Sequence, residues 1–337
     1  MGIKHWSSVV ALVIFSLLAS GCSVKNMLAS TVVKVSNAHM TPWFMASNDT
    51  DVMCAMGEGF SAMVFPMGPN IDPMIPLVTL ASGMCADEKA KAEELRFYRA
   101  MQRDDVPTAQ DARSMQKRWT KLAAQRMYFG YEATARYFGE PVEGECPKFK
   151  NDDMEMSYLF GMFGGLQAFQ LDLSLLGAAG VPTDLMPKAI NGLKCVDSDK
   201  FWGIPNAVLA AREIVEARLD GDSAGEKLGW DRLHLAARVG EAQGVRMAHI
   251  VEGALYMSLG DDEGLKNLIR KHVAMKEEQP ANPELNLLDE MATRNILLMS
   301  DKLWTENTGK RTPFGKLGTF WDDKAVPNDA LDIDDIL

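Results

Sequence analysis

Apolar residues recur at intervals of three and four positions along most of this chain, which is the spacing of an amphipathic α-helix. The two-residue alternation that is typical of strands is nearly absent. Turn clusters such as Gly68-Pro69-Asn70 interrupt the helical pattern. The spacing predicts helices over about 48–65, 73–102, 111–139, 153–177, 182–193, 205–218, 223–240, 244–259, 262–276 and 283–305, with a polar connection at 103–111.

The stretch AHIVEGALYMSLGDDEGL, residues 248–265, has part of the pattern of a tetratricopeptide unit. Gly253 and Tyr256 have the G-x2-Y spacing of that repeat, whereas His249 and Glu252 stand where the repeat has Trp and Leu. No period of fixed length continues over the rest of the chain. The expected fold class is therefore all-α, with degenerate tetratricopeptide-like antiparallel helical hairpins in a solenoid or compact array.

The N-terminus predicts an exported lipoprotein. Lys4 is followed by the apolar run 9–18 and then by LASGC, which is typical of a bacterial signal peptide over residues 1–21. Cys22 after Ser-Gly matches a lipobox and is the predicted lipidation site; an ordinary signal peptide with a free cysteine nearby is the alternative. Because Ser rather than Asp follows Cys22, we expect an outer-membrane anchor that faces the periplasm.

Three segments follow the signal peptide. We expect the lipid anchor and an N-terminal helix in 22–47, the helical-repeat domain in 48–306, and an irregular C-terminal tail in 307–337. The tail has scattered Gly, Pro and Asp without a period, which indicates a mostly loose segment. Its candidates for docking on the domain are Phe314, Phe320 and Trp321.

Four cysteines remain after Cys22, and the oxidising periplasm favours disulfides. Of the three possible pairings, we favour Cys54–Cys85, which would tie consecutive helices, and Cys146–Cys195, which would tie two loops at the same end of neighbouring hairpins. The chain has no C-x-x-C pair, so a thioredoxin-like redox site and a thiolate zinc site are not expected.

Charge and motifs argue against two classes of function. With 46 acidic and 35 basic residues, the net charge is −11, so we expect no nucleic-acid partner. The spacings of metalloprotease, α/β-hydrolase and P-loop motifs do not occur. Glu213 and Glu216 share a helical face but are better explained as a solvated face than as an acid–base pair. We therefore expect no enzyme activity, no cofactor and no metal site.

Methionine is frequent, with 22 residues. Met53 and Met56 near Cys54, or Met154 and Met156, could offer soft ligands to Cu(I) in the periplasm. The methionines are spread along the chain and do not cluster with His, however, and Met also suits adaptable apolar surfaces. An ordinary core or an adaptable cavity is therefore the favoured interpretation over copper binding.

The segment 156–177 is apolar around most of its circumference, which predicts a buried central helix or a membrane-spanning one. Gln167, Gln170 and Asp172 argue against spanning, because a central Asp costs about 2.5–3.5 kcal/mol in a bilayer. Core packing is one role for this helix, and lining an apolar cavity is the other. The candidate cavity residues are Tyr158, Phe160, Met162, Phe163 and Phe169.

In layout the chain resembles the T-component (TatT-like) lipoproteins of tripartite ATP-independent periplasmic (TRAP) transporters. The resemblance runs from about residue 49 to 304 and rests on textures such as RMYFGYEATARYFG, MSYLFGMFGGLQAF, FWGIPNAVLAAREIVEARLD and HIVEGALYMSLGDDEGLKNLIRKHV. The four extra cysteines, the methionine content and the tail depart from the family pattern. The resemblance implies a helical periplasmic lipoprotein, possible homotrimers around apolar tunnels, and a solute-binding protein of the transporter as partner.

Two functions are carried forward from these patterns. The first is a non-enzymatic accessory of a TRAP-type transporter, which binds or relays an apolar small molecule and docks a periplasmic solute-binding protein. The alternative is a tetratricopeptide-like scaffold lipoprotein for envelope assembly that has no small-molecule ligand. Both functions place the protein at the membrane through the lipid on Cys22.

Overall fold

The computed structural model describes residues 25–324, and it is all-helical over this range, without a strand. Residues 25–35 are helical and continue into a π-helical turn, η1. The predicted signal peptide and Cys22 lie outside the described residues. The further elements are η1 (Ser36–Met40), α2 (Thr41–Met45), α3 (Thr50–Val64), η2 (Phe65–Met67), η3 (Pro69–Met74), α4 (Ile75–Met101), α5 (Val106–Phe138), α6 (Asp152–Ser174), α7 (Leu185–Leu193), α8 (Ile204–Leu219), α9 (Ser223–Ala242), α10 (Ala248–Leu259), α11 (Asp262–Glu278) and α12 (Asn286–Thr308).

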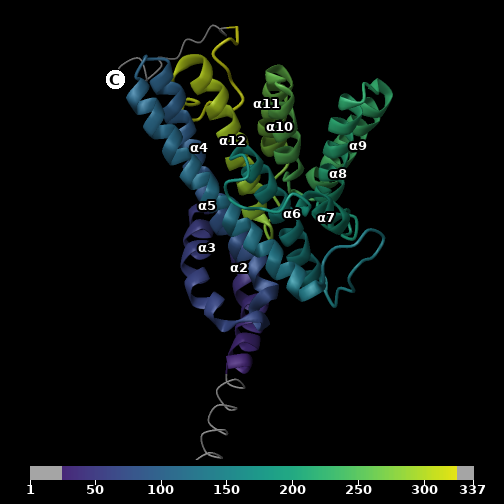
Figure 1. Cartoon of the computed structure of the whole chain (residues 1–337). Coiled ribbons are helices and arrows are strands. Elements are labelled where there is room, and N and C mark those ends of the chain that lie inside the picture. Colours follow the sequence, from purple (N-terminus) through teal and green to yellow (C-terminus); the bar gives the residue numbers. More distant parts are fainter. Residues whose placement is uncertain (1–24, 325–337) are drawn as a thin grey trace, which may run out of the picture.

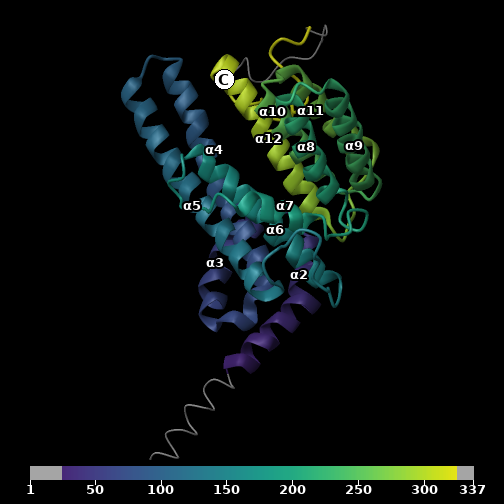
Figure 2. The ribbon, with the colours of Figure 1, turned by 45° about the vertical axis from the view of Figure 1, so that its right-hand side comes forward.

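Consecutive helices pack as pairs joined by short turns. The pairs α4–α5, α8–α9 and α10–α11 stand next to one another in Figure 1, with α6 and α7 between the first pair and the second. The last helix, α12, then returns to pack against α2, α3 and α4 (Figure 2). Because the C-terminal helix meets the N-terminal ones, the array closes on itself. Most of its helices share one large core, and α8, α9 and α10 enclose a smaller one.

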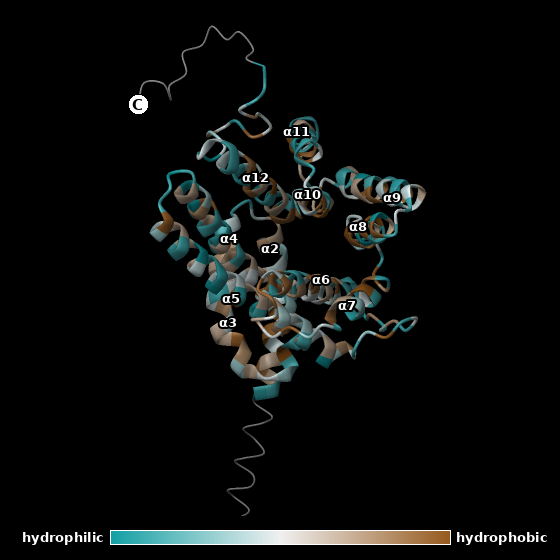
Figure 3. Ribbon diagram, turned by 45° about the horizontal axis from the view of Figure 1, so that its top comes forward, coloured by the Kyte–Doolittle hydropathy of each residue, from teal (hydrophilic) through white to brown (hydrophobic). Residues whose placement is uncertain are grey.

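Hydropathy follows this arrangement. In Figure 3, hydrophilic residues predominate on α11 and on the outer parts of α4 and α5. The buried side chains of α6 include Leu159, Met162 and Leu166, so this helix is central, as its sequence predicted. None of the helices within residues 25–324 combines the length and the hydropathy needed to cross a membrane.

Glycines bring four helices of the core close together. A Cβ atom on Gly57 of α3 would lie 2.6 Å from the backbone nitrogen of Ser82 in α4. A Cβ atom on Gly161 of α6 would lie 1.9 Å from Oγ1 of Thr134 in α5. Neither approach leaves room for a larger residue, so the α3–α4 and α5–α6 contacts depend on glycine.

Two disulfides stabilise the array, and both are the pairs expected from the sequence. Cys54–Cys85 joins α3 to α4 with a Cα–Cα distance of 5.6 Å. Cys146–Cys195 joins the α5–α6 loop to the turn after α7, with a Cα–Cα distance of 5.3 Å. Both distances lie within the usual range for a disulfide.

Of the predicted helix boundaries, the start of α5 differs most from its predicted position. The connection predicted at 103–111 is shorter, because α5 begins at Val106. Asp105 caps this helix by accepting a hydrogen bond from the backbone N–H of Thr108 at 3.2 Å. Pro107 lies in the first turn, where its missing N–H costs nothing. The polar residues that suggested a loop therefore form the first turn of a helix.

Part of the predicted tail packs on the domain. Phe320 is buried, and Trp321 contacts Trp304 of α12 edge to face at 5.6 Å between ring centroids. The indole N–H of Trp304 donates a hydrogen bond to the carbonyl oxygen of Thr319 at 3.1 Å. Phe314, the third docking candidate, is instead fully exposed. Residues 325–337 of the tail lie outside the described residues.

Candidate ligand cavity

The largest described cavity lies where six helices meet: α3, α4, α5, α6, α10 and α12. It encloses about 130 Å³. An apolar cavity of roughly 150 Å³ in a protein core takes up benzene, so this one has room for about one aromatic ring or a short alkyl chain. The residues that line its apolar part include Met53, Met84, Met127, Phe163, Met247, Ile250, Met291, Leu298 and Met299.

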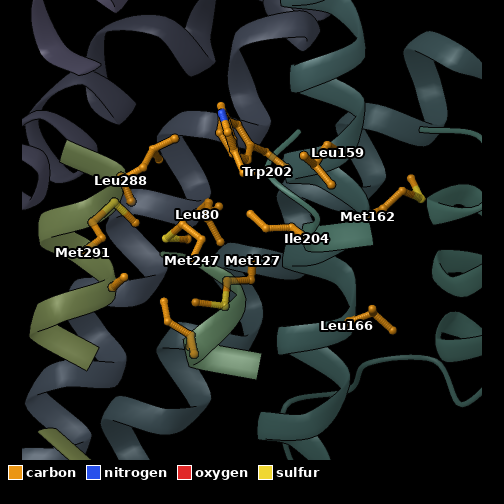
Figure 4. Packing of buried hydrophobic residues seen from close by; sticks show 14 of the residues in the cluster. Leu80, Met127, Leu159, Met162, Leu166, Trp202, Ile204, Met247, Leu288 and Met291 are labelled. Atoms are coloured by element: carbon orange, nitrogen blue, oxygen red, sulfur yellow. The ribbon is translucent and has the colours of Figure 1, made fainter. Parts of the chain in front are cut away.

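Methionine is the dominant side chain of this wall. Six thioethers from several helices face the cavity, and the disulfide Cys54–Cys85 forms part of the same wall. Figure 4 shows Met127, Met247 and Met291 converging on one region of the core. Thioether side chains are flexible and polarisable, and they make favourable contacts with aromatic rings. The wall can therefore adjust to an apolar guest at little cost.

The rim of the cavity is polar and balanced in charge. Two acidic residues, Asp87 and Glu88, stand there with two basic ones, Lys91 and Arg294. The neutral polar residues of the rim are Thr50, Gln167, Gln170 and Asn295. Arg294 of α12 donates hydrogen bonds to Glu88 and, at 3.0 Å, to Oγ1 of Thr50.

These bonds hold α12 against α3 and α4 at the mouth of the cavity. Hydrogen bonding to Glu88 raises the pKa of the Arg294 guanidinium, against the opposing effect of burial. Arg294 therefore stays charged and paired at the rim. Because its charge is already neutralised, the rim favours a neutral or weakly polar end on a guest.

Two smaller cavities continue from the first toward the N-terminal helix. The second encloses about 30 Å³ and shares Met53, Met84 and Phe163 with the first. The third encloses about 40 Å³ and shares Phe44 and Phe160 with the second. Phe163 and Phe160 thus stand at the two junctions of a series of three apolar cavities.

The five predicted cavity residues separate into two groups. Phe160 and Phe163 line cavities of the series. Tyr158 and Met162 are fully buried on another side of α6, close to Gly192 of α7. Phe169 is partly buried in the core and lines none of the three.

Tyr158 belongs to an aromatic cluster outside the cavities. Its ring lies 5.3 Å from each of the rings of Phe138 and Phe149, between centroids. Burial raises the pKa of its phenol to about 12, so the group stays neutral. Its role in the fold is to pack α6 against α5 and the loop that carries Cys146.

Most residues of the cavity wall were not predicted from the sequence. The methionines come from segments far apart in the chain, so no local pattern marks them as one surface. The only signal was their frequency, together with the expectation of an adaptable apolar cavity. Phe163 and Phe160 were found because both lie on the apolar helix α6.

A buried polar network, which no sequence pattern predicted, lies beside the cavity. His249 of α10 contacts Glu241 of α9 through Nε2 at 2.8 Å and His272 of α11 through Nδ1 at 2.9 Å. His272 in turn contacts Oγ1 of Thr293 in α12 at 3.1 Å. Four helices thus meet through one chain of hydrogen bonds.

A second buried contact adjoins the network. Arg246 donates to the carboxylate of Asp289 at 2.7 Å, and both side chains are fully buried. The same guanidinium donates to the carbonyl oxygens of Met275 and Gln279 at the end of α11. These contacts satisfy charges inside the fold. Within residues 25–324 no three His, Cys, Asp or Glu side chains are grouped to hold a metal ion.

The cavity series and its rim are therefore the candidate ligand site, and the buried network belongs to the folded core beside it. Comparisons of the chain with protein-family models, with curated proteins and with solved structures gave no match.

Proposed function

We propose that this protein is a periplasm-facing lipoprotein, anchored through Cys22 in the outer membrane, that serves a TRAP-type solute transporter. It binds or relays an apolar solute and docks the periplasmic solute-binding protein of the transporter. In this proposal the helical pairs are degenerate tetratricopeptide-like hairpins, and the protein is not an enzyme. Assembly as a homotrimer belongs to the same proposal.

The observation that supports solute binding is the series of three apolar cavities in the closed core. The largest has a methionine wall that can adapt to a guest and a charge-balanced rim that can admit one. Its volume of about 130 Å³ is sufficient for one ring of a solute. A longer apolar solute fits only if Phe163 and Phe160 turn aside and join the cavities.

The α8–α9 pair supports the proposed docking of a solute-binding protein. This pair stands at the edge of the array in Figure 1, and it presents four large aliphatic side chains to solvent. They are Val215, Leu219, Leu228 and Leu235. Exposed apolar side chains mark a protein-binding surface where they form a contiguous patch. The same surface supports the alternative function, a scaffold lipoprotein without a small-molecule ligand.

The ligand part is tested with the mature, unlipidated chain that begins after Cys22. Native mass spectrometry followed by organic extraction should show a co-purifying apolar molecule, and the mass of the assembly gives the number of subunits. An empty protein that also fails to take up toluene or indole would leave the scaffold function as the better explanation.

A matched pair of variants tests the position of the site. Phe163→Asp places a charge between the first two cavities and should reduce uptake of toluene at least tenfold. Phe169→Asp changes an equally partly buried phenylalanine of α6 outside the cavities and should leave uptake within twofold. Far-UV circular dichroism checks the fold of both. Equal uptake by the two variants would show that the cavity assignment is wrong.

A further inference from the structure

The N-terminal helical segment, residues 25–45, presents large apolar side chains to solvent. Leu28, Val35 and Trp43 have exposed fractions of 52%, 46% and 68%. They follow one another at intervals of seven and eight residues. Seven residues are two α-helical turns, and the second interval holds the π-helical turn η1, which adds a residue. The three side chains therefore form one stripe along the segment.

The neighbouring face of the segment is buried with the same spacing. Ala29, Ser36 and Phe44 are one position further along and pack on the body of the protein. The segment is thus held in a fixed orientation. Leu28, Val35 and Trp43 are exposed beside the buried face, although Val32, between Leu28 and Val35, packs partly on the core. An exposed tryptophan at the end of such a stripe is costly in water, but it suits the interface between water and lipid.

The charge of this segment differs from that of the rest of the chain. Lys25 and Lys34 are exposed, and no acidic residue occurs before Asp49. The whole chain, in contrast, carries a net charge of −11. A basic segment with an apolar stripe complements an anionic membrane surface, whereas the acidic remainder would be repelled by it.

The position of the segment also agrees with a membrane partner. It projects from the end of the molecule that lies opposite to the α8–α9 and α10–α11 pairs (Figures 1 and 2). Only Ser23 and Val24 separate Lys25 from Cys22. Three peptide units span at most about 11 Å, so a lipid on Cys22 would keep the start of the helix at the headgroups.

We propose that Leu28, Val35 and Trp43, with Lys25 and Lys34, form a membrane-facing stripe that binds the surface of an anionic bilayer. The stripe would turn the cavity-bearing body to a set orientation above the membrane. This inference rests on the proposed lipid anchor for its location, but the contact itself is a property of the folded chain.

The first experiment uses full-length protein that is expressed in bacteria and purified from the cell envelope. It is placed in vesicles of phosphatidylethanolamine and phosphatidylglycerol (3:1) that contain brominated acyl chains. Tryptophan fluorescence should be quenched, and Trp43→Phe should remove most of the quenching. Trp230→Phe, on α9 at the far end, should leave it unchanged. Quenching that survives Trp43→Phe would overturn the proposal.

The second experiment separates the stripe from the anchor. Unlipidated mature chain should float with the anionic vesicles, and a triple variant with Leu28→Asn, Val35→Asn and Trp43→Asn should lose at least tenfold in partitioning. The matched control changes Leu219, Leu228 and Leu235 to Asn and should partition as the unmodified chain does. Equal partitioning of the two variants, or no partitioning of the unmodified chain, would contradict the membrane assignment.

A second copy of the chain is the competing occupant of the stripe. Sedimentation equilibrium of the unmodified chain and of the triple variant decides between a membrane and a second copy. Loss of self-association in the variant would assign the stripe to a subunit interface instead. Mass spectrometry of the full-length protein reports the lipid on Cys22 independently. A missing lipid would therefore count against the proposed function, while binding of the unlipidated chain to vesicles would still support the stripe.

Discussion

At the scale of single residues, the most unusual feature is the set of ionisable side chains in the core between α9 and α12. Glu241 is buried, which raises its pKa, but hydrogen bonds from His249 and Lys271 outweigh burial and lower the pKa to about 2. The carboxylate is therefore ionised and accepts the N–H of His249. Burial, with the nearby charges of His249, Arg246 and Lys276, lowers the pKa of His272 to about 3.

These two shifts predict the acid sensitivity of the fold. The unfolded chain takes up a proton at His272 below about pH 6.5, while the folded chain resists this until about pH 3. Folding stability should therefore fall as the pH drops from 6.5 toward 3, by up to about 1.4 kcal/mol per pH unit from this group. Glu241 adds a further loss between its ordinary value of 4.5 and about 2, because its folded pKa is lowered.

Urea denaturation at several pH values between 7 and 4.5 measures this effect. His272→Gln should lower stability at pH 7, since it disturbs the contact with His249, and it should flatten the dependence on pH. His39→Gln is the control, because that histidine is exposed on η1. An unchanged slope for His272→Gln would mean that another group is responsible for the acid sensitivity.

At the scale of elements, two glycines of α3 differ only in what lies next to them. A Cβ atom on Gly57 would meet the backbone of α4 at 2.6 Å, whereas nothing lies within 4 Å of a Cβ atom on Gly59. Gly57→Ala should therefore destabilise the protein by about 1–3 kcal/mol, because α3 must move away from α4. Gly59→Ala should stabilise it by about 0.5–1 kcal/mol through helix propensity. Chemical denaturation of the two variants checks the sign of each effect, and a loss of stability in both would rule out the difference in packing as the cause.

The two disulfides should differ in their effect on the cavity. Closing loops of 31 and 49 residues is worth roughly 4 kcal/mol each in the chain-entropy model. Replacing either pair by Ser should therefore lower stability by a similar amount, about 2–4 kcal/mol. Only Cys54–Cys85 forms part of the cavity wall.

Removal of Cys54–Cys85 should weaken uptake of toluene several-fold, while removal of Cys146–Cys195 should leave uptake unchanged. Calorimetric titration with toluene on both double variants measures this. Comparable losses of uptake in both would show that the disulfides act on the cavity only through global stability.

At the scale of the whole molecule, residues 320–323, after α12, help to hold the array together. Phe320 is 4% exposed, and Asp322 and Asp323 pair with Lys266 and Arg270 of α11. Phe320→Ala should cost about 3–4 kcal/mol, because it leaves a cavity in the core. Phe314→Ala should change stability by less than about 0.5 kcal/mol, since that ring is in solvent. Thermal unfolding of the two variants is the measurement, and equal stabilities would mean that the tail is not part of the folded unit.

The amino-acid sequence by itself determined the local structure of this protein. Helical periodicity predicted nearly every helix, because an amphipathic helix needs only residues that are close together in the chain. The cysteine pairing could be anticipated because each pair joins neighbouring elements. The start of α5 was predicted too late, because Asp105 and Pro107 cap and begin this helix. Residues of these types are equally common in polar loops.

Only the tertiary structure decided what the helices enclose. The return of α12 to α2, α3 and α4 closes the array, and this long-range packing brings Met53, Met127 and Met291 into one wall. It also pairs His249 with His272 and divides the predicted residues of α6 between cavity and core. Those outcomes depend on contacts between segments distant in the chain, for which periodicity carries no information, since it describes one helix at a time.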